Sequence, residues 1–225
     1  DTLVALFARF VTESEKEFSS RFAQSLDLVA IGTLADLMPL RNENRILVKA
    51  GLRALSSTQR EGLRELLFRK NLYGKKIGTS DIGWQISPLL NATGRLGVPD
   101  VAARLLLSKD PDEQRSLSDQ ILELNTKRRK LGDEAWDKVL EGARKSHEEL
   151  SGKLVVVGGT DIFRGITGIL ASRLAKYFNA PSIVVAILDG KAVGSARSVN
   201  GIHIKRLLDE LADLFIDYGG HDFAA

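Results

Sequence analysis

The sequence predicts an α/β protein in which a mostly helical first part, a long connecting helix and a small α/β domain with a mixed sheet follow one another. Helical periodicity dominates the first 109 residues. A single helical pattern then runs from Asp110 to about Leu150, and apolar runs typical of buried strands appear only after Gly152. The predicted boundaries are therefore 1–109, 110–151 and 152–225.

Composition limits the function classes. With 225 residues, 44% hydrophobic and 27% charged, the chain can form one large or two modest domains. It has no cysteine, which excludes disulfides and thiolate metal sites. No segment resembles a signal peptide or is apolar enough to span a bilayer, so we expect a cytoplasmic protein without a membrane partner. The net charge of +3 is compatible with a polyanionic partner but does not indicate one.

In the first part, two helices are expected within residues 1–25, with a break between them near Thr12–Lys16. Further helices are expected at Asn44–Leu55, in a segment that ends at Arg69, in a short segment that stops near Pro88, and at residues 100–108. Thr58 and Glu61 have the spacing of a capping box for the helix ending at Arg69. The first residue is Asp1 and the last is Ala225, so both ends look cut from a longer chain, and the final domain is expected to be truncated.

The run Asp27–Asp36 rises from one carboxylate and ends on another, and it is expected to form a buried helix or strand. A carboxylate at such a position must be hydrogen-bonded or face a cation. Asp36 either caps the following turn, the commoner use of such a residue, or is a metal ligand held on a rigid element. The residue pattern leaves both open.

The segment Asn91–Gly97 has two glycines around Arg95 and predicts a tight turn that presents a guanidinium. Arginine grips phosphate through two parallel hydrogen bonds, but a loop with a solvated arginine has the same sequence. Asp110 and Pro111 then give a strong start for the connecting helix, which would span roughly 60 Å. Its basic run Lys127–Lys130 is best interpreted as a solvated face of the helix. If this run lined a gap between the lobes, it would follow a nucleic-acid backbone.

In the last part, Lys153–Val157 and Pro181–Ile187 are expected strands, with a turn at Gly158–Thr160 and a helix from Gly165 to Phe178 between them. Asp189-Gly190 predicts a hairpin into an antiparallel strand, Lys191–Arg197. A helix from about His203 to Leu214 follows. His203 is expected to cap or pack near its start, and His147 to be a solvated helix residue.

Three features of this part favour anion binding. The helix near Gly165 offers its N-terminus, although the glycine spacing is wrong for a dinucleotide site. On a strand, Ser195 and Arg197 point to the same face and would hold a phosphate together, unless they form an exposed edge. Gly219, Gly220 and His221 allow close backbone approach beside an imidazole, or else form an ordinary turn.

Taken together, these segments resemble the RecJ family, single-stranded-DNA-specific exonucleases of the DHH phosphoesterase superfamily. The segment 32–36 (Gly-Thr-Leu-Ala-Asp) is similar to the fourth motif of the superfamily. The segment 91–96 (Asn-Ala-Thr-Gly-Arg-Leu) is similar to a more specific RecJ segment. The segments 165–173, 194–198 and 219–221 are similar to the DHH-associated domain. On this resemblance, the first part is the C-terminal remnant of the DHH lobe.

The resemblance implies a 5′-3′ exonuclease of DNA repair and recombination that hydrolyses single-stranded DNA with two Mn²⁺ or Mg²⁺ ions. Asp36 would be a catalytic metal ligand and Arg95 a catalytic, phosphate-neutralising residue. Ser195, Arg197, Gly219, Gly220 and His221 would hold the substrate. A monomer is expected, with single-strand-binding or recombination proteins as partners.

Two departures qualify this assignment. The acidic first motifs and the Asp-His-His motif are absent, so the metal site is incomplete and the chain alone is expected to be inactive. Phe163 also stands where family members often have histidine. The alternatives are a small-substrate DHH phosphoesterase, acting on cyclic dinucleotides or short oligonucleotides, and a catalytically dead scaffold of the same superfamily.

Overall fold

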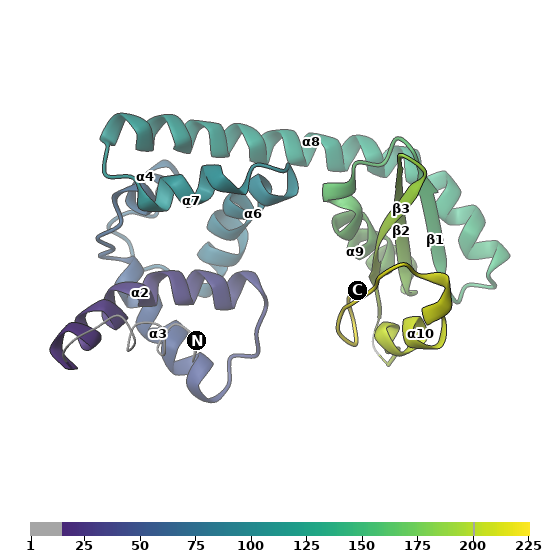
Figure 1. Ribbon diagram of the computed structural model, residues 1–225, viewed down its shortest axis with the longest axis horizontal. Coiled ribbons are helices and arrows are strands. Elements are labelled where there is room, and N and C mark those ends of the chain that lie inside the picture. Colours follow the sequence, from purple (N-terminus) through teal and green to yellow (C-terminus); the bar gives the residue numbers. More distant parts are fainter. Residues whose placement is uncertain (1–14, 200) are drawn as a thin grey trace. The chain divides into compact units, whose positions relative to one another are not determined.

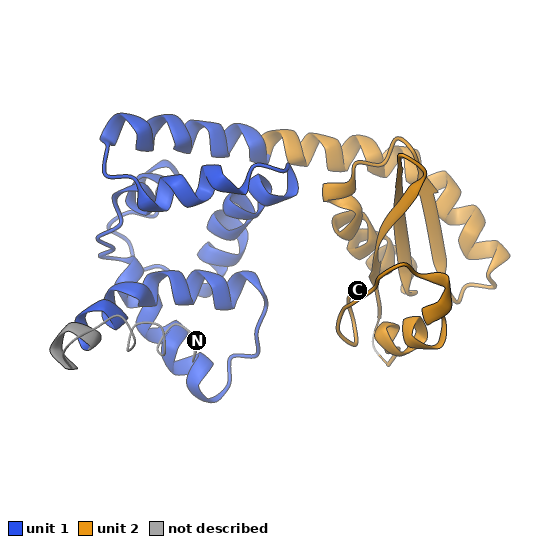
Figure 2. Ribbon diagram, in the orientation of Figure 1, with its two compact units in different colours: residues 1–125 blue, residues 126–225 orange. Residues whose placement is uncertain are grey.

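The computed structural model describes residues 15–199 and 201–225, which divide into two compact units at Asn125/Thr126 (Figures 1 and 2). The first unit is helical, and the second contains a three-stranded sheet. This confirms the predicted fold class. The first predicted helix and most of the predicted break at Thr12–Lys16 lie outside the described residues. None of the helices in the described part is both long and apolar enough to cross a membrane.

The first unit is built from α-helices joined by short loops. Its elements are α2 (Glu15–Ala35), α3 (Asn42–Leu55), α4 (Glu61–Arg69), α5 (Thr79–Asp81), the π-helix η1 (Ile82–Ile86), α6 (Ser87–Arg95) and α7 (Pro99–Leu107), followed by the start of α8 (Pro111–Glu149). Apolar side chains at helical spacing form its two core clusters, which include Leu63, Leu67, Ile82 and Ile86 in one and Leu66, Leu89, Leu105 and Ile121 in the other.

Three predictions about helix boundaries in this unit were wrong. Residues 15–35 form one continuous helix, so the run from Asp27 is the C-terminal half of α2. The predicted turn at Asn91–Gly97 is instead the end of α6, and the chain turns only at Leu96 and Gly97. Pro88 does not stop the helix, because the wider turn of η1 immediately before α6 accommodates a residue that has no N–H to donate.

The buried carboxylate of Asp27 explains a fourth difference. Asp27 is 2% exposed, and its side chain accepts hydrogen bonds from the Thr58 hydroxyl at 2.6 Å and the Arg60 Nε at 3.2 Å. The Thr58 hydroxyl in turn accepts a hydrogen bond from the Arg60 N–H at 3.2 Å, so Thr58 joins α2 to the start of α4, but the N-cap residue of α4 is Arg60. The expectation that this carboxylate must be hydrogen-bonded is confirmed.

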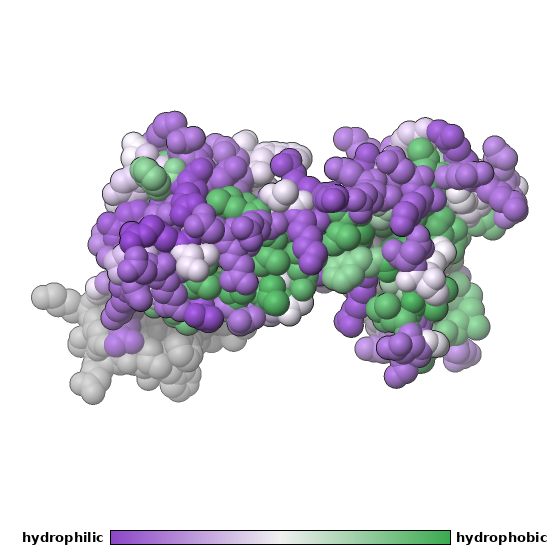
Figure 3. Space-filling view, turned by 90° about the horizontal axis from the view of Figure 1, so that it is seen from above, coloured by the Kyte–Doolittle hydropathy of each residue, from purple (hydrophilic) through white to green (hydrophobic). Residues whose placement is uncertain are grey.

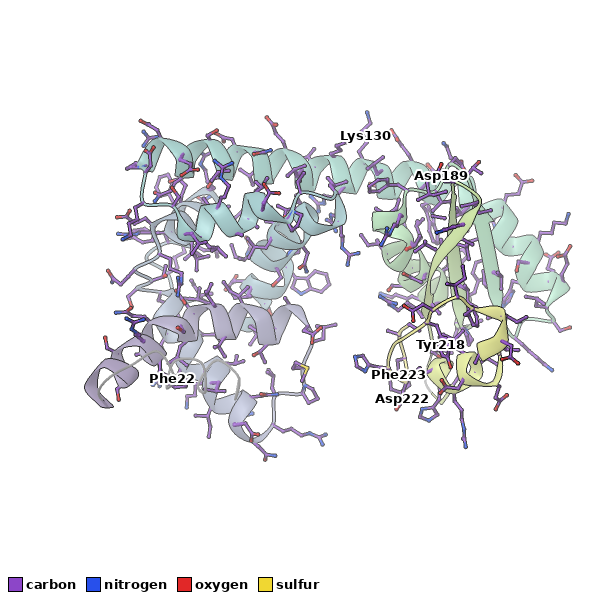
Figure 4. The ribbon with its side chains drawn as sticks, in the orientation of Figure 1. Phe22, Lys130, Asp189, Tyr218, Asp222 and Phe223 are labelled. Carbon is purple, nitrogen blue, oxygen red and sulfur yellow. The ribbon has the colours of Figure 1, made fainter. Side chains whose placement is uncertain are left out.

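The long helix α8 begins as its sequence indicates. Asp110 caps it by accepting a hydrogen bond from the Asp112 N–H at 2.9 Å, and Pro111 is its first residue. It ends at Glu149, where Gly152 has φ +76° and donates to the His147 carbonyl. Figure 3 looks down on the side where α8 runs, and that face is mostly hydrophilic. Lys130 projects outward from α8 (Figure 4).

The second unit carries the mixed sheet in the order β1 (Val155–Gly159), β2 (Ser182–Leu188), β3 (Lys191–Arg197). β1 pairs with β2 in parallel, and β2 with β3 antiparallel through the hairpin at Asp189 and Gly190, both at positive φ. The 3₁₀ turn η2 (Arg164–Ile166) and α9 (Thr167–Phe178) connect β1 to β2. The chain continues through α10 (Ile204–Glu210) and the 3₁₀ turn η3 (Ala212–Leu214).

Side chains from α8, α9 and the sheet share one core in this unit, among them Trp136, Val139, Val157, Leu170, Leu174 and Val184. Three local predictions were wrong. Gly158 and Gly159 lie in β1 and not in a turn, and the helix predicted to reach Leu214 ends at Glu210. His147 is half-buried and packs on the Phe178 ring with centroids 4.8 Å apart, so it is not a solvated residue.

Candidate phosphate-binding and metal-binding residues

In the first unit, Asp36 and Arg95 line one open groove. Gly32 at the end of α2, Asn91 in α6 and Pro99 at the start of α7 line it as well. The fold therefore brings together two residues that are far apart in the sequence. A second groove, which reaches Met38, also meets Asp36 from the α2 side.

Asp36 follows directly after α2, and its backbone N–H still donates to the Gly32 carbonyl at 3.0 Å. Its carboxylate is exposed and makes no hydrogen bond or ion pair with any described residue. It does not cap α3, which begins without a side-chain cap bond. Because a carboxylate oxygen is the ligand that Mg²⁺ and Mn²⁺ favour, Asp36 has the chemistry of a metal ligand.

A metal site needs more than this one carboxylate. Within residues 15–199 and 201–225, no three His, Asp or Glu side chains come together in a way that would hold an ion. The described residues alone therefore do not fit a two-ion centre.

Arg95 is the last residue of α6 and is partly buried. Burial lowers the pKa of its guanidinium from the usual value, because desolvation disfavours the charged form. An arginine nevertheless stays protonated at neutral pH. The helix holds this charge at the groove that Asp36 also lines, which is the arrangement expected of a group that neutralises phosphate.

In the second unit, β3 places Ser195 and Arg197 on one face, against the first turn of α9. The Ser195 Oγ lies 3.1 Å from the Thr167 Oγ1. A Cβ added at Gly168 would lie 3.1 Å from the Arg197 Nη2, so only glycine leaves the guanidinium its present position. Two hydroxyls and a guanidinium thus gather at a helix N-terminus, where the helix dipole favours an anion.

The helix N-terminus itself is less open than the sequence suggested. The 3₁₀ turn η2 runs into α9, and the Thr167 N–H donates to the Arg164 carbonyl. Phe163, at the start of η2, is 40% exposed. Thr167 and Gly168 were not singled out as site residues from the sequence. A threonine and a glycine opening a predicted helix beside an anion-binding pattern are the signal that would have indicated them.

The C-terminal segment adds to the open edge of β3. The Ala196 N–H donates to the Ala225 carbonyl at 2.6 Å, and Ala224 bridges to both Arg197 and His221. A side chain at Gly220 would collide with the Ala224 carbonyl oxygen and Ala225 Cα, so glycine is required for this close approach. The backbone pairing therefore connects His221 to the strand that carries Arg197.

His203 is not part of this cluster of site residues. It forms the N-cap of α10 without a side-chain cap bond, stacks on Phe223 and lies 3.3 Å from an Asp222 carboxylate oxygen. Figure 4 shows Asp222 and Phe223 together beside α10. The expectation that His203 packs near its helix start is confirmed.

Comparison with known proteins first defines the class of the second unit: residues 151–225 match the DHHA1 domain family. The whole chain is then similar to RecJ. It is 39% identical over 205 residues to the single-stranded-DNA-specific exonuclease RecJ of Bacillus subtilis, covering 89% of this chain and 25% of that protein.

Two crystal structures of RecJ from Thermus thermophilus, in complex with Mg²⁺ and with Mn²⁺, each match with a TM-score of 0.79. They are 35% and 34% identical, and the matches cover 90% of this chain and 31% and 29% of theirs. The resemblance to RecJ inferred from the motifs is confirmed. The chain spans about a quarter to a third of the length of these relatives.

Proposed function

We propose that this chain is part of a metal-dependent exonuclease that hydrolyses single-stranded DNA from the 5′ end. The observation that carries the proposal is the convergence of Ser195 and Arg197 on the first turn of α9. Two hydroxyls and a guanidinium lie together there, and this combination suits a phosphate group. The similarity to RecJ supports a strand of DNA as the molecule that carries this phosphate.

In this proposal Asp36 contributes one carboxylate to a divalent-metal centre in the intact protein. Mn²⁺ or Mg²⁺ bound there would activate water and stabilise the oxygens of the displacement. Arg95 neutralises phosphate charge in the groove that Asp36 lines. Ser195 and Arg197 bind the phosphate of the terminal nucleotide, and Gly219, Gly220 and His221 border it from the segment paired with β3.

The test separates binding from cleavage in the full-length protein. We expect Asp36→Asn to keep its affinity for a labelled single-stranded oligonucleotide but to lose Mn²⁺-dependent release of 5′ mononucleotides, because only the metal ligand is changed. Arg197→Ala should instead weaken binding at least tenfold. Full cleavage by Asp36→Asn, or unchanged binding by Arg197→Ala, would contradict the roles proposed for these residues.

The 225-residue chain alone should bind a strand but not cleave it, because its described residues bring no group of carboxylates or imidazoles together around Asp36, and a metal centre needs several ligands. Adding Mn²⁺ to the purified chain and following release of mononucleotides tests this. Release at a rate comparable to that of the full-length protein would show that the chain holds a complete centre. A comparison of dinucleotide and long-strand cleavage by the full-length protein distinguishes the small-substrate alternative.

A further inference from the structure

Helix α3 carries a row of cations that the proposed site does not use. Arg45, Lys49 and Arg53 follow one another at intervals of four residues, so they lie along one side of the helix. Each step advances about 6 Å along the axis. Lys76, from the loop before α5, lines the same open groove. We call these four residues the α3 basic groove.

The positive charge of this groove is not neutralised within the described residues. No acidic residue is among those that line it, and none of the four cations forms an ion pair there. Other arginines of the same unit behave differently: Arg60 pairs with Asp27, Arg69 with Glu65 and Asp119, and Arg104 with Glu113. Four unneutralised cations along one groove make a binding surface for an anion that is itself extended.

Apolar side chains also line the groove. Val48 and Ile77 are buried, whereas Leu40 is exposed and Leu52 is partly exposed. Leu40 also belongs to the exposed loop of residues 36–41 between α2 and α3, and Met38 in this loop lines one of the grooves that meet Asp36. The α3 basic groove is therefore connected to the Asp36 site by a short loop within the same unit.

We infer that the α3 basic groove binds the phosphate backbone of a nucleic-acid strand that extends beyond the Asp36 site. The regular spacing of three cations along a rigid helix is comparable to that of successive phosphates in an extended strand. A positively charged groove that follows the backbone is one part of how proteins hold a single strand without reading its sequence. This inference rests on the proposed function and adds a second contact region to it. An acidic peptide is the competing occupant.

The test measures binding of a fluorescein-labelled oligothymidylate to the 225-residue chain by fluorescence anisotropy at several salt concentrations. The variant Arg45→Gln/Lys49→Gln/Arg53→Gln should lose at least tenfold in affinity at low salt. The slope of log K against log [salt] should also fall by about 2, because each lost phosphate contact removes roughly 0.7 from it.

The control variant Lys109→Gln/Lys145→Gln/Lys153→Gln removes the same charge from exposed positions outside the groove. We expect its slope to stay close to that of the parent chain. Circular dichroism and the urea midpoint verify that both variants fold. Equal losses in the two variants would overturn the inference by reducing the effect to net charge.

Three further outcomes separate the explanations. If the triple α3 variant loses binding to a polyglutamate peptide but keeps its binding to oligothymidylate, the groove is assigned to an acidic peptide and the inference is overturned. If the unsubstituted chain does not bind oligothymidylate at all, both this inference and the proposed function fail. If it binds, and Arg197→Ala weakens binding while the α3 variant matches the control, only this inference fails.

Discussion

Gly168 shows how a single residue sets the geometry of the proposed phosphate-binding cluster, which consists of Thr167, Ser195 and Arg197. Its missing side chain leaves room for the Arg197 guanidinium, which a Cβ would approach to 3.1 Å. The crowded atom is the end of a flexible side chain, so the helix tolerates the change and the guanidinium moves. The role of this glycine is therefore in positioning the charge and not in permitting the fold.

We expect Gly168→Ala to leave the free energy of unfolding unchanged or slightly higher, while affinity for a single-stranded oligonucleotide falls several-fold. Gly132→Ala in α8 is the matched control, since a Cβ there meets nothing within 4 Å. It should raise the free energy of unfolding by up to about 1 kcal/mol without changing binding. Urea unfolding and anisotropy measure the two quantities. Unchanged binding in Gly168→Ala would show that the guanidinium position is not set by this residue.

The buried carboxylate of Asp27 contributes to stability and not to the proposed site. Replacing it with alanine removes the carboxylate to which the Thr58 hydroxyl and the Arg60 guanidinium both donate. The cost of breaking such a buried pair is about 3 kcal/mol. We expect Asp27→Ala to lower the free energy of unfolding in urea by this amount, whereas Thr58→Ser, which keeps the hydroxyl, should lose less. Similar losses in both variants would mean that packing, and not the hydrogen bond, dominates.

At the scale of whole elements, α10 and the segment after η3 are joined by a small polar network. Asp209 pairs with Lys205 and accepts a hydrogen bond from the Tyr218 hydroxyl at 3.0 Å. The acceptor favours the protonated phenol, so this hydrogen bond raises the pKa of Tyr218. The same network lowers the pKa of Asp209, through Lys205 first and Tyr218 second.

The expected pH dependence follows from these directions. A raised tyrosine pKa contributes stability that is present below the unfolded pKa and is lost as the pH rises through the folded one. The depressed Asp209 pKa contributes stability that is present above the unfolded pKa and is lost as the pH falls through the folded one. We expect Asp209→Asn to lower the pKa of Tyr218 in an ultraviolet titration of tyrosinate, with Tyr218→Phe identifying the signal. An unchanged titration would contradict the network.

Element types and their order were predictable because hydrophobic periodicity determines them. Asp110 and Pro111 located the start of α8, and Asp189-Gly190 located the hairpin before β3. Boundaries that depend on long-range contacts were not predictable. Thr58 has the spacing of a cap, but its hydroxyl bonds the distant Asp27, and Asn91–Arg95 stays helical because Ala92 and Thr93 are buried in the unit.

The candidate site was predictable to the same extent. The alternation of side chains along a strand placed Ser195 and Arg197 on one face, as the structure has them. The contributions of Thr167 and Gly168 depend on how α9 packs against β3, which local sequence does not encode. The row of cations on α3 was not singled out from the sequence, and the absence of facing carboxylates along the described groove required the structure.

At the scale of the whole molecule, the two units have separate cores although one helix runs through both. Leu117 and Ile121 of α8 pack in the first unit, and Trp136, Val139 and Ala143 pack in the second. The buried clusters of the described residues contain no member shared between the units. Each unit therefore has an apolar core of its own to stabilise it.

We accordingly expect a core truncation to destabilise mainly the unit that contains it. Leu66→Ala in the first unit and Leu170→Ala in the second both remove fully buried side chains, and each should cost about 2–5 kcal/mol. Hydrogen exchange followed by mass spectrometry locates the effect: protection should fall in residues 15–125 for Leu66→Ala and in 126–225 for Leu170→Ala. The two variants serve as controls for each other, because they remove the same group at equal burial. Equal loss of protection in both units from either variant would show that α8 couples them into one cooperative structure. The proposed phosphate-binding cluster of the second unit would then depend on the stability of both units.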